Sequence, residues 1–417
     1  MFQDTNKDNN PNKTEPMYKT EMIGQGTYGC IYKPNIPCKN EKPTKSTNKK
    51  FISKLQRNQE NSEREANLGK IIKEKIPKHN TMFAPIIDSC IVNIEKVNSP
   101  DIEKCDIVTN DRAEGRNIEY KSYKMRYAGK QFLSQYFLSL IKKSPKKLIK
   151  RMIETHIYLL KSLNKLGKLT PPMIHYDLKD NNIMYDEKQG VPIIIDFGLS
   201  FELDPNKNFD QAIALEQYYV FYEKYPPWCI DLVLLSYIVQ KIAKTKEIKT
   251  TITNADVEKL QEICHTFISE NDIFNNNGIS KEEAEVFKQE LYAFILTYLE
   301  KTWETMFSDL QKGYVSWDNY SLSVIYLFYI QDLLKTIDSP LIDKYIALLK
   351  QVILTVPTNP RPTIDEVIRE LKKITSNIDK KEYNKMIYSI KTRTTNLENI
   401  NIELNKKTVA NKQPDNK

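Results

Sequence analysis

The segment His175 to Asn182, which reads H-Y-D-L-K-D-N-N, decides the fold. It follows Leu148 to Leu166, where apolar residues recur with helical periodicity, and it precedes the apolar run Ile193 to Ile195. That run leads directly into Asp196-Phe197-Gly198. D-F-G alone is common by chance, whereas H-x-D-L-K-x-x-N followed by an apolar run and D-F-G is not. We therefore interpret the two segments as parts of one site.

The polar residues of these segments suit phosphoryl transfer. Asp177 is expected to orient an acceptor hydroxyl and to accept its proton. Lys179 is expected to neutralise charge on the phosphoryl group in transit. Asn182 and Asp196 are expected to hold Mg²⁺, with the Asp196 ion bridging the β- and γ-phosphates.

Upstream lies a glycine-rich segment, Ile23 to Ile31, with the spacing G-x-G-x-x-G. Small residues let backbone N–H groups approach phosphate oxygens. A Rossmann turn or an ordinary hairpin has the same spacing, but a Rossmann turn opens a helix, whereas Ile31-Tyr32 continues a strand pattern. We therefore predict a strand-turn-strand lid over ATP, formed by Ile23, Gly24, Gln25, Gly26, Thr27, Tyr28, Gly29, Cys30 and Ile31.

A lysine on the next strand should grip the α- and β-phosphates. Phe51 to Lys54 reads F-I-S-K and fits the V-A-I-K pattern loosely, so Lys54 is the candidate. Lys49 and Lys50 compete with it. Strand alternation places Ile52 and Lys54 on the same face.

The helical stretch after this strand should supply a glutamate that holds the lysine. Its candidates are Glu60, Glu63 and Glu65. We favour Glu65, because Leu68 and Ile71 follow it on one helical face. Gly69 argues against this choice, since a packing residue is expected one turn after Glu65.

Taken in order, these motifs resemble the eukaryotic protein kinase superfamily from about Tyr18 to Leu371. The resemblance implies an α+β, two-lobed protein-kinase-like fold, with a small β-rich N-lobe carrying one main helix and a larger, mainly helical C-lobe. ATP would lie in the cleft between the lobes. It also implies that Met125 resembles the gatekeeper and that Tyr127 and Ala128 provide the adenine-binding backbone.

The same resemblance implies a Ser/Thr protein kinase that uses ATP and Mg²⁺ and acts on a protein substrate. Lys179, two residues after Asp177, is similar to Ser/Thr kinases. Long inserts, the Asn/Lys-rich composition and the cysteine pattern resemble kinases of large DNA viruses. Structural support is expected from His175, Phe197, Gly198, Asp318 and Arg361.

Two positions depart from the family's pattern. Tyr176 stands where most kinases have the arginine that pairs with a phosphorylated activation loop. Trp228, in Tyr225-Pro226-Pro227-Trp228, replaces the glutamate of A-P-E. Arg361 therefore loses its usual partner, and either another carboxylate such as Glu223 substitutes or Trp228 stacks on the guanidinium.

The buried helix after A-P-E usually begins D-x-x-S, and two sites compete for that role. Asp318, in W-D-N-Y-S-L, fits better than Asp231, and it would support the backbone of the His175 loop. This choice makes residues 229 to about 312 an inserted helical segment. The insert could dock a substrate or partner, or could merely pack.

Domain boundaries follow from these assignments. They are a disordered leader at 1–16, a kinase domain at 17–375 with its N-lobe at about 17–127 and C-lobe at about 128–375, and a helix fragment with a flexible tail at 376–417. The apolar runs Ile230 to Ile242 and Leu322 to Leu334 are too short to span a bilayer and read as buried helices. No membrane association is expected.

Composition restricts function only weakly. The net charge of +8 over 417 residues is mild and gives no indication of nucleic-acid binding beyond a basic surface. Six scattered cysteines without ligand spacing argue against zinc and predict free thiols in a reducing, cytoplasmic compartment, or in host cytoplasm or a virion for a viral protein. The oligomeric state is not predicted.

Two other functions compete with an active protein kinase. A pseudokinase scaffold would bind nucleotide without transfer, but Lys54, Asp177, Lys179, Asn182 and Asp196 are all present. Small-molecule kinases that act on aminoglycosides or choline typically lack the D-L-K sequence and often lack D-F-G. Lys179 and Phe197-Gly198 therefore favour a protein kinase.

Overall fold

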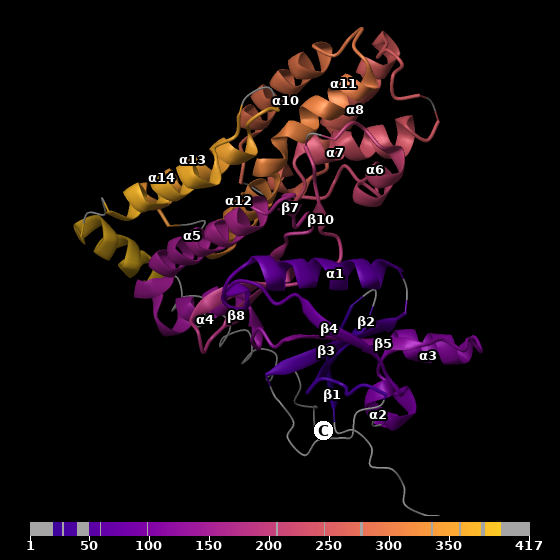
Figure 1. Cartoon of the computed structure of the whole chain (residues 1–417). Helices are drawn as coiled ribbons and strands as arrows, with labels where there is room; N and C mark the ends of the chain where they lie inside the picture. Colours follow the sequence, from indigo (N-terminus) through magenta and orange to yellow (C-terminus); the bar gives the residue numbers. More distant parts are fainter. Residues whose placement is uncertain are drawn as a thin grey trace, which may run out of the picture. The chain divides into compact units, whose positions relative to one another are not determined.

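The computed structural model describes residues 20–26, 29–39, 50–58, 60–97, 99–205, 207–245, 247–275, 278–334, 337–357, 360–376 and 380–392. The chain divides into two compact units, the first formed by residues 1–80 and 84–127 and the second by residues 81–83 and 128–417. The first unit is built around a β-sheet and the second is mainly helical (Figure 1). The predicted α+β class is confirmed.

One antiparallel sheet with the order β1-β2-β3-β5-β4 organises the first unit. Its strands are β1 (Glu21–Gly26), β2 (Gly29–Lys33), β3 (Phe51–Arg57), β4 (Ile86–Ile91) and β5 (Tyr120–Arg126). The strand pattern predicted on both sides of the glycine-rich turn is present, with Gly26 opposite Gly29. The strand that carries Lys54 extends to Arg57, with Gln56 buried and paired with Lys121, so the helical stretch expected after it begins only at Glu60.

Helix α1 (Glu60–Lys75) packs on this sheet and approaches β4 closely (Figure 1). Gly69 is at the point of closest approach. A Cβ atom there would lie 1.9 Å from the Ile86 carbonyl oxygen, a distance that no side chain tolerates. Gly69 is therefore the residue at which α1 packs against the sheet. A glycine at this position no longer argues against Glu65 as the partner of Lys54.

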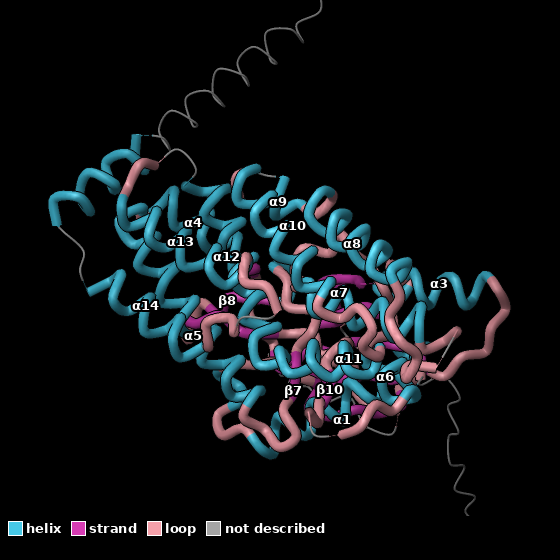
Figure 2. Tube along the Cα trace, turned by 90° about the horizontal axis from the view of Figure 1, so that it is seen from above, coloured by secondary structure: helices cyan, strands magenta, loops and turns pink. Residues whose placement is uncertain are grey.

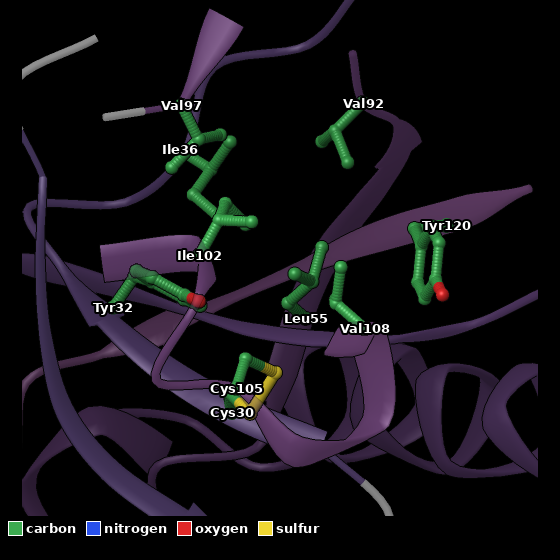
Figure 3. Packing of buried hydrophobic residues seen from close by; sticks show 10 residues of the cluster. All are labelled: Cys30, Tyr32, Ile36, Leu55, Val92, Val97, Ile102, Cys105, Val108 and Tyr120. Atoms are coloured by element: carbon green, nitrogen blue, oxygen red, sulfur yellow. A yellow bond between two sulfur atoms is a disulfide. The ribbon is translucent and has the colours of Figure 1, made fainter. Parts of the chain in front are cut away.

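Between β4 and β5 lie two short helices, α2 (Ser99–Ile102) and α3 (Asp106–Ala113). Asp111 of α3 accepts from Arg57 Nη2 at 2.6 Å and from the Tyr120 hydroxyl at 2.7 Å. Buried side chains from α2, α3, the sheet and the loops between them form one cluster (Figure 3). They are Tyr32, Ile36, Leu55, Val92, Val97, Ile102, Val108 and Tyr120, together with Cys30 and Cys105.

The expectation of free thiols is wrong for the first unit. Cys30 is bonded to Cys105, and Cys38 is bonded to Cys90 (Figure 3 shows the first pair). The bonded cysteines are 75 and 52 residues apart in the sequence, so their spacing does not indicate that they pair. Because disulfides persist in oxidising surroundings, the argument for a reducing compartment loses its basis.

The second unit contains two small sheets, β6-β8-β9 and β7-β10. Their strands are β6 (Gln131–Phe132), β7 (Met173–Ile174), β8 (Ile183–Asp186), β9 (Val191–Ile194) and β10 (Phe201–Glu202). Its helices, shown in Figures 1 and 2, are α4 (Leu133–Lys143), α5 (Leu148–Gly167), α6 (Gln211–Gln217), α7 (Ile230–Tyr237), α8 (Asn254–Ser269), α9 (Asp272–Asn275), α10 (Lys281–Leu296), α11 (Trp303–Gln311), α12 (Trp317–Leu334), α13 (Pro340–Ile353) and α14 (Ile364–Ser376).

Helix α12 lies at the centre of this unit. It contacts α4, α5 and α13 (Figure 2), and nearly all of its side chains are buried. A helix that is apolar all round is buried all round. Helix α7 is also wholly buried, so both apolar runs form buried helices as predicted. Over the described residues, no helix is long and apolar enough to cross a membrane.

The remaining boundaries are only partly visible. The segment 229–312 holds α7 to α11, and residues 380–392 form a further helix. The predicted leader at 1–16 and the tail after residue 392 lie outside the described residues. The extent of the insert stays a prediction.

Candidate active site

The loop that begins at His175 follows β7 and has a strained backbone. Tyr176 has φ of 68°, in the left-handed region that non-glycine residues rarely adopt. The carboxylate of Asp318 accepts from the N–H groups of His175 and Tyr176, at 2.9 and 3.1 Å. Such a conformation costs about 1–3 kcal/mol and persists where surrounding contacts fix it. Asp318 is thus the carboxylate that fixes this loop.

Aromatic side chains fix the same residue from the other side. The Trp228 indole N–H donates to the Tyr176 carbonyl at 3.0 Å, and the two rings lie 4.8 Å apart. Phe201 and Tyr218 pack edge-on against the Tyr176 ring. The two residues that depart from the family's pattern therefore contact each other. Aromatic packing therefore surrounds the tyrosine that stands in place of the family's arginine.

Both carboxylate oxygens of Asp177 are engaged within the second unit. Lys179 Nζ lies 2.8 Å from Oδ2, and the Asn182 amide donates to the same oxygen at 3.1 Å. The Asn182 amide also donates to the Asp177 backbone carbonyl at 2.8 Å. The structure thus brings together three residues that the sequence assigned to phosphoryl transfer.

The other oxygen of Asp177 has a partner that the sequence did not reveal. The Tyr225 hydroxyl donates to Oδ1 at 2.6 Å. Tyr225 lies on the loop between α6 and α7, 48 residues from Asp177 along the chain. Burial, followed by the charge of Asp177, raises the pKa of Tyr225 above its usual value. In the sequence it was visible only as the first residue of Y-P-P-W.

The Asp196-Phe197-Gly198 turn is anchored by its phenylalanine. Phe197 is buried, with its ring edge-on to His175 at 5.1 Å and to Phe83 at 5.9 Å. His175 Nε2 lies 3.1 Å from the Ile195 carbonyl oxygen. Asp196 has φ of 61°, and its carboxylate accepts from the Gly198 N–H at 3.4 Å. The turn is therefore held against the His175 loop by ring packing.

Oxygen donors suited to a divalent metal are present in this unit. The Asn182 amide nitrogen binds Asp177, and its amide oxygen takes no part in those two bonds. The Asp196 carboxylate is a second oxygen donor. Mg²⁺ is usually bound by one or two carboxylates together with substrate phosphates, so this pair fits that ion. Where the chain is described, no cluster of three or more His, Cys, Asp or Glu could hold a metal by itself.

In the first unit, Lys54 of β3 pairs with Glu65 of α1 at 2.9 Å. Both side chains are largely buried, with exposed fractions of 13% and 5%. Glu63 binds Lys121 at 2.6 Å instead, and Lys50 is exposed just before β3. Lys49 and the Glu60 side chain lie outside the described residues.

The glycine-rich hairpin has one closed and one open part. A Cβ on Gly29 would lie 2.5 Å from the Leu55 carbonyl oxygen, so β2 packs too closely for a side chain there. Beside Gly24 and Gly26 there is open space, as backbone contact with phosphates requires. The side chain of Gln25 binds Asp106, whose N–H donates to it at 3.0 Å. Thr27 and Tyr28, predicted lid residues, are not described.

The residues predicted to contact adenine lie at the end of β5 and just after it. Met125 packs against Ala66, Ile86 and Tyr123. The Tyr127 N–H donates to the Lys50 carbonyl at 2.9 Å, so it already has a backbone acceptor. Ala128, the next residue, is buried in the second unit.

Another carboxylate does substitute as the partner of Arg361, but it is Asp231 and not Glu223. The Arg361 guanidinium binds Asp231, with Nη1 3.0 Å from Oδ1 and Nη2 bonded to Oδ2. Asp231 lies in the first turn of α7, three residues after Trp228, so the carboxylate is displaced by three positions along the chain. The Arg361 guanidinium lies over the Tyr320 ring, 5.8 Å from its centroid.

Comparison with known proteins gives two local matches. Over 50 residues the chain is 48% identical to a probable serine/threonine-protein kinase, samkC, of Dictyostelium discoideum. Over 53 residues it is 43% identical to a second, samkA, of the same organism. Each match covers 12% of this chain, and they cover only 6% and 8% of those proteins. No known family model matches the chain.

Proposed function

We propose that the chain is a Ser/Thr protein kinase that transfers the γ-phosphoryl group of ATP to a protein hydroxyl. The observation that carries the proposal is the arrangement around Asp177, which lies within bonding distance of both Lys179 and Asn182. Phosphoryl transfer depends mainly on positioning and on stabilising charge. The Asp177 carboxylate, the Lys179 ammonium and the Asn182 amide lie within one short segment, and together they supply the positioning and the charge stabilisation.

Each residue has a proposed role in this reaction. Asp177 orients the acceptor hydroxyl and accepts its proton, and Lys179 offsets charge on the phosphoryl oxygens. Asn182 and Asp196 hold Mg²⁺, which supplies further charge stabilisation when bound. His175, Phe197, Gly198 and Asp318 keep the loop and the turn in place.

The first unit, together with Ala128, the residue that directly follows it in the chain, is proposed to bind the nucleotide. Lys54, held by Glu65, grips the α- and β-phosphates, and the backbone beside Gly24 and Gly26 approaches the phosphates. Because the Tyr127 N–H already binds Lys50, we assign the adenine contact to the Ala128 N–H. Met125 borders the adenine as the gatekeeper.

Lys179, Phe197-Gly198 and the two local matches support a protein acceptor and Ser/Thr specificity. They favour a protein kinase over a small-molecule kinase. The long inserts and Asn/Lys-rich composition support a further proposal, that the chain is related to kinases of large DNA viruses.

The test is transfer of labelled phosphate from ATP, with Mg²⁺, to generic acceptor proteins. Asp177→Asn should lower the rate by roughly 10²–10⁴-fold, as expected for loss of a general base. Lys54→Met should remove activity as well. Equal labelling by the wild type and Asp177→Asn would refute the proposal. Stabilisation by ATP without transfer to any acceptor would identify a pseudokinase instead.

Glu63 and Glu65 provide a matched pair of variants. Glu65→Gln should lower the rate by about tenfold or more, since a hydrogen bond to a charged group contributes about 1.5–3 kcal/mol. Glu63→Gln removes the same charge two residues away but leaves Lys54 paired, so the rate should change little. Equal losses in both variants would contradict the role of the Lys54–Glu65 pair.

A further inference from the structure

The glycine-rich hairpin has one face that both of its strands share. Cys30 and Tyr32 alternate with Ile31 along β2, so their side chains lie on the same face of the strand. Gln25 of β1 is directly opposite Cys30 in the strand register, which places it on that face as well. The Gln25 side-chain oxygen lies 3.4 Å from the Cys30 sulfur. Both strands therefore contribute side chains to one surface.

The buried part of this surface is fixed to α2 and α3. Cys30 and Tyr32 are fully buried. Cys30 is bonded to Cys105, the residue just before α3 (Figure 3). The Tyr32 hydroxyl donates to the Asp101 carbonyl of α2 at 3.1 Å. A covalent bond and a buried hydrogen bond thus hold β2 against the two helices.

Gln25 connects the exposed part of the same surface to α3. Its amide nitrogen donates to the carboxylate of Asp106, and its amide oxygen accepts from the Asp106 N–H at 3.0 Å. One residue therefore engages both ends of the Gln25 amide. Gln25 lies between Gly24 and Gly26, beside which there is open space. Asp106 thus holds the chain at the point where phosphate contact is proposed.

A glycine-rich turn should bind phosphates better when other contacts already fix it. Glycine loses more conformational freedom than any other residue when its backbone becomes ordered. A turn that becomes ordered only when ATP binds must lose that freedom at the expense of affinity. Contacts that order Gly24 and Gly26 beforehand should therefore raise the affinity for ATP.

We propose that Asp106 is a positioning residue for the nucleotide. Through Gln25, and together with the Cys30–Cys105 bond, it holds the glycine-rich turn in the conformation that binds the phosphates of ATP. The inference rests on the proposed function, because it concerns the hairpin assigned to ATP. It adds α3, which contains none of the residues assigned to the nucleotide above, to the elements that determine ATP affinity.

The charge of Asp106 allows a sharp test of this role. A carboxylate near the phosphates should weaken ATP binding by repulsion, whereas its contact with Gln25 should strengthen binding. Asp106→Ala removes both the charge and the side-chain contact. Asp106→Asn removes the charge, but its amide oxygen can still accept from Gln25. The two variants therefore separate the contact from the charge.

The experiment measures kcat, KM for ATP and KM for a generic protein acceptor, and the Kd of ATP with Mg²⁺ by calorimetry, on full-length proteins. Asp106→Ala should raise KM and Kd for ATP about three- to tenfold, as expected for loss of a hydrogen bond, and should leave kcat and the acceptor KM unchanged. Asp106→Asn should stay within about twofold of the wild type, because the bond is kept. Asn110→Ala, at an exposed position one turn later on α3, is the matched control and should equal the wild type.

A double variant tests whether Asp106 acts through Gln25. Gln25→Ala should raise the Kd of ATP about as much as Asp106→Ala does. The double variant Gln25→Ala/Asp106→Ala should raise it no further, because two residues that share one contact do not contribute additively. Fully additive increases would overturn the inference.

The disulfide provides an independent measurement. Cys30→Ser/Cys105→Ser should raise the Kd of ATP roughly tenfold, because the hairpin must then be ordered on binding. Cys38→Ser/Cys90→Ser removes the other bridge of the same unit and should leave the Kd unchanged. Both are measured well below their unfolding temperatures, so that stability does not enter. Equal increases in the two variants would contradict the role of the Cys30 bridge.

The remaining outcomes distinguish this inference from the proposed function. If Asp106→Ala binds ATP as tightly as the wild type, the inference fails and the proposed function stands. Tighter binding by both Asp106 variants would show that charge dominates, and it would also overturn the inference. If the wild type binds ATP but transfers no phosphate, the proposed function fails, and the Kd values still decide the inference. If the wild type does not bind ATP, both fail.

Discussion

Arg361 and Asp231 form an ion pair in the interior of the second unit, with exposed side-chain fractions of 3% and 2%. Arg361 Nη1 also lies 3.2 Å from the Ser316 hydroxyl, just before α12. The pair therefore joins the segment before α14 to the first turn of α7 and to the start of α12. Trp228, which replaces the expected carboxylate, is free to brace Tyr176 instead.

The first prediction concerns this ion pair. Asp231→Ala should lower the free energy of unfolding by about 3–5 kcal/mol, because it leaves Arg361 charged and buried without its carboxylate. Urea denaturation of the purified variant measures this. Glu223→Gln, at the position first considered for this role, should change stability by no more than about 0.5 kcal/mol. A larger effect from Glu223 would contradict the assignment.

The second prediction tests the contact between α1 and β4. Gly69→Ala should lower the free energy of unfolding by about 1–3 kcal/mol or more. The added Cβ atom would overlap the Ile86 carbonyl oxygen and push α1 away from the sheet. Gly167→Ala in α5 is the matched control, because no atom lies within 4 Å of its Cβ. It should leave stability unchanged or raise it by up to about 1 kcal/mol. Thermal unfolding of both variants separates the two outcomes.

The features that could be predicted from the sequence are those whose signals lie in a few neighbouring residues. The strands around the glycine-rich turn, the buried helices and the loop at His175 carry their signals within a few residues. Lys54 and Glu65, only eleven residues apart, were paired correctly from strand and helix spacing. Such features follow from the spacing of apolar and polar residues along the chain, which can be read from a single sequence.

Most contacts between distant segments could not be predicted from local pattern, and the contact of Asp318 with the His175 loop was expected only through the family resemblance. Tyr225 meets Asp177 across 48 residues, and Arg361 meets Asp231 across 130. The residues that surround Tyr225 and Arg361 in the sequence do not indicate which distant side chain will contact them in the fold. Gly69 was misjudged for a related reason, because its requirement arises from the backbone of β4.

The third prediction concerns the disulfides. Without reductant, the denatured protein should expose two thiols, Cys229 and Cys264, and after reduction all six. Cys30→Ser/Cys105→Ser should lower the free energy of unfolding by roughly 4 kcal/mol, as expected when a bridge closing a 75-residue separation is lost. Thiol titration and urea denaturation measure these quantities. Six thiols in unreduced protein would show that the bridges do not form.

The fourth prediction is a pH dependence that arises from His156. The imidazole is fully buried, stacks on Tyr326 at 4.2 Å, and has Nδ1 2.9 Å from the Tyr345 hydroxyl. Burial lowers the pKa of His156 from its ordinary 6.5 to about 3. Between these values the unfolded chain binds the proton and the folded chain does not. The stabilising contribution is therefore complete above pH 6.5 and is lost as the pH falls.

The measurement is the free energy of unfolding between neutral pH and about pH 4. His156 alone should contribute a slope of up to about 1.4 kcal/mol per pH unit in this window. His156→Gln, which cannot titrate, should show a slope smaller by that amount. His265→Gln, at an exposed position, should keep the wild-type slope. A buried neutral imidazole at position 156 requires a smaller slope in His156→Gln than in the wild type. If His156→Gln instead keeps the wild-type slope, the acid sensitivity arises from other groups.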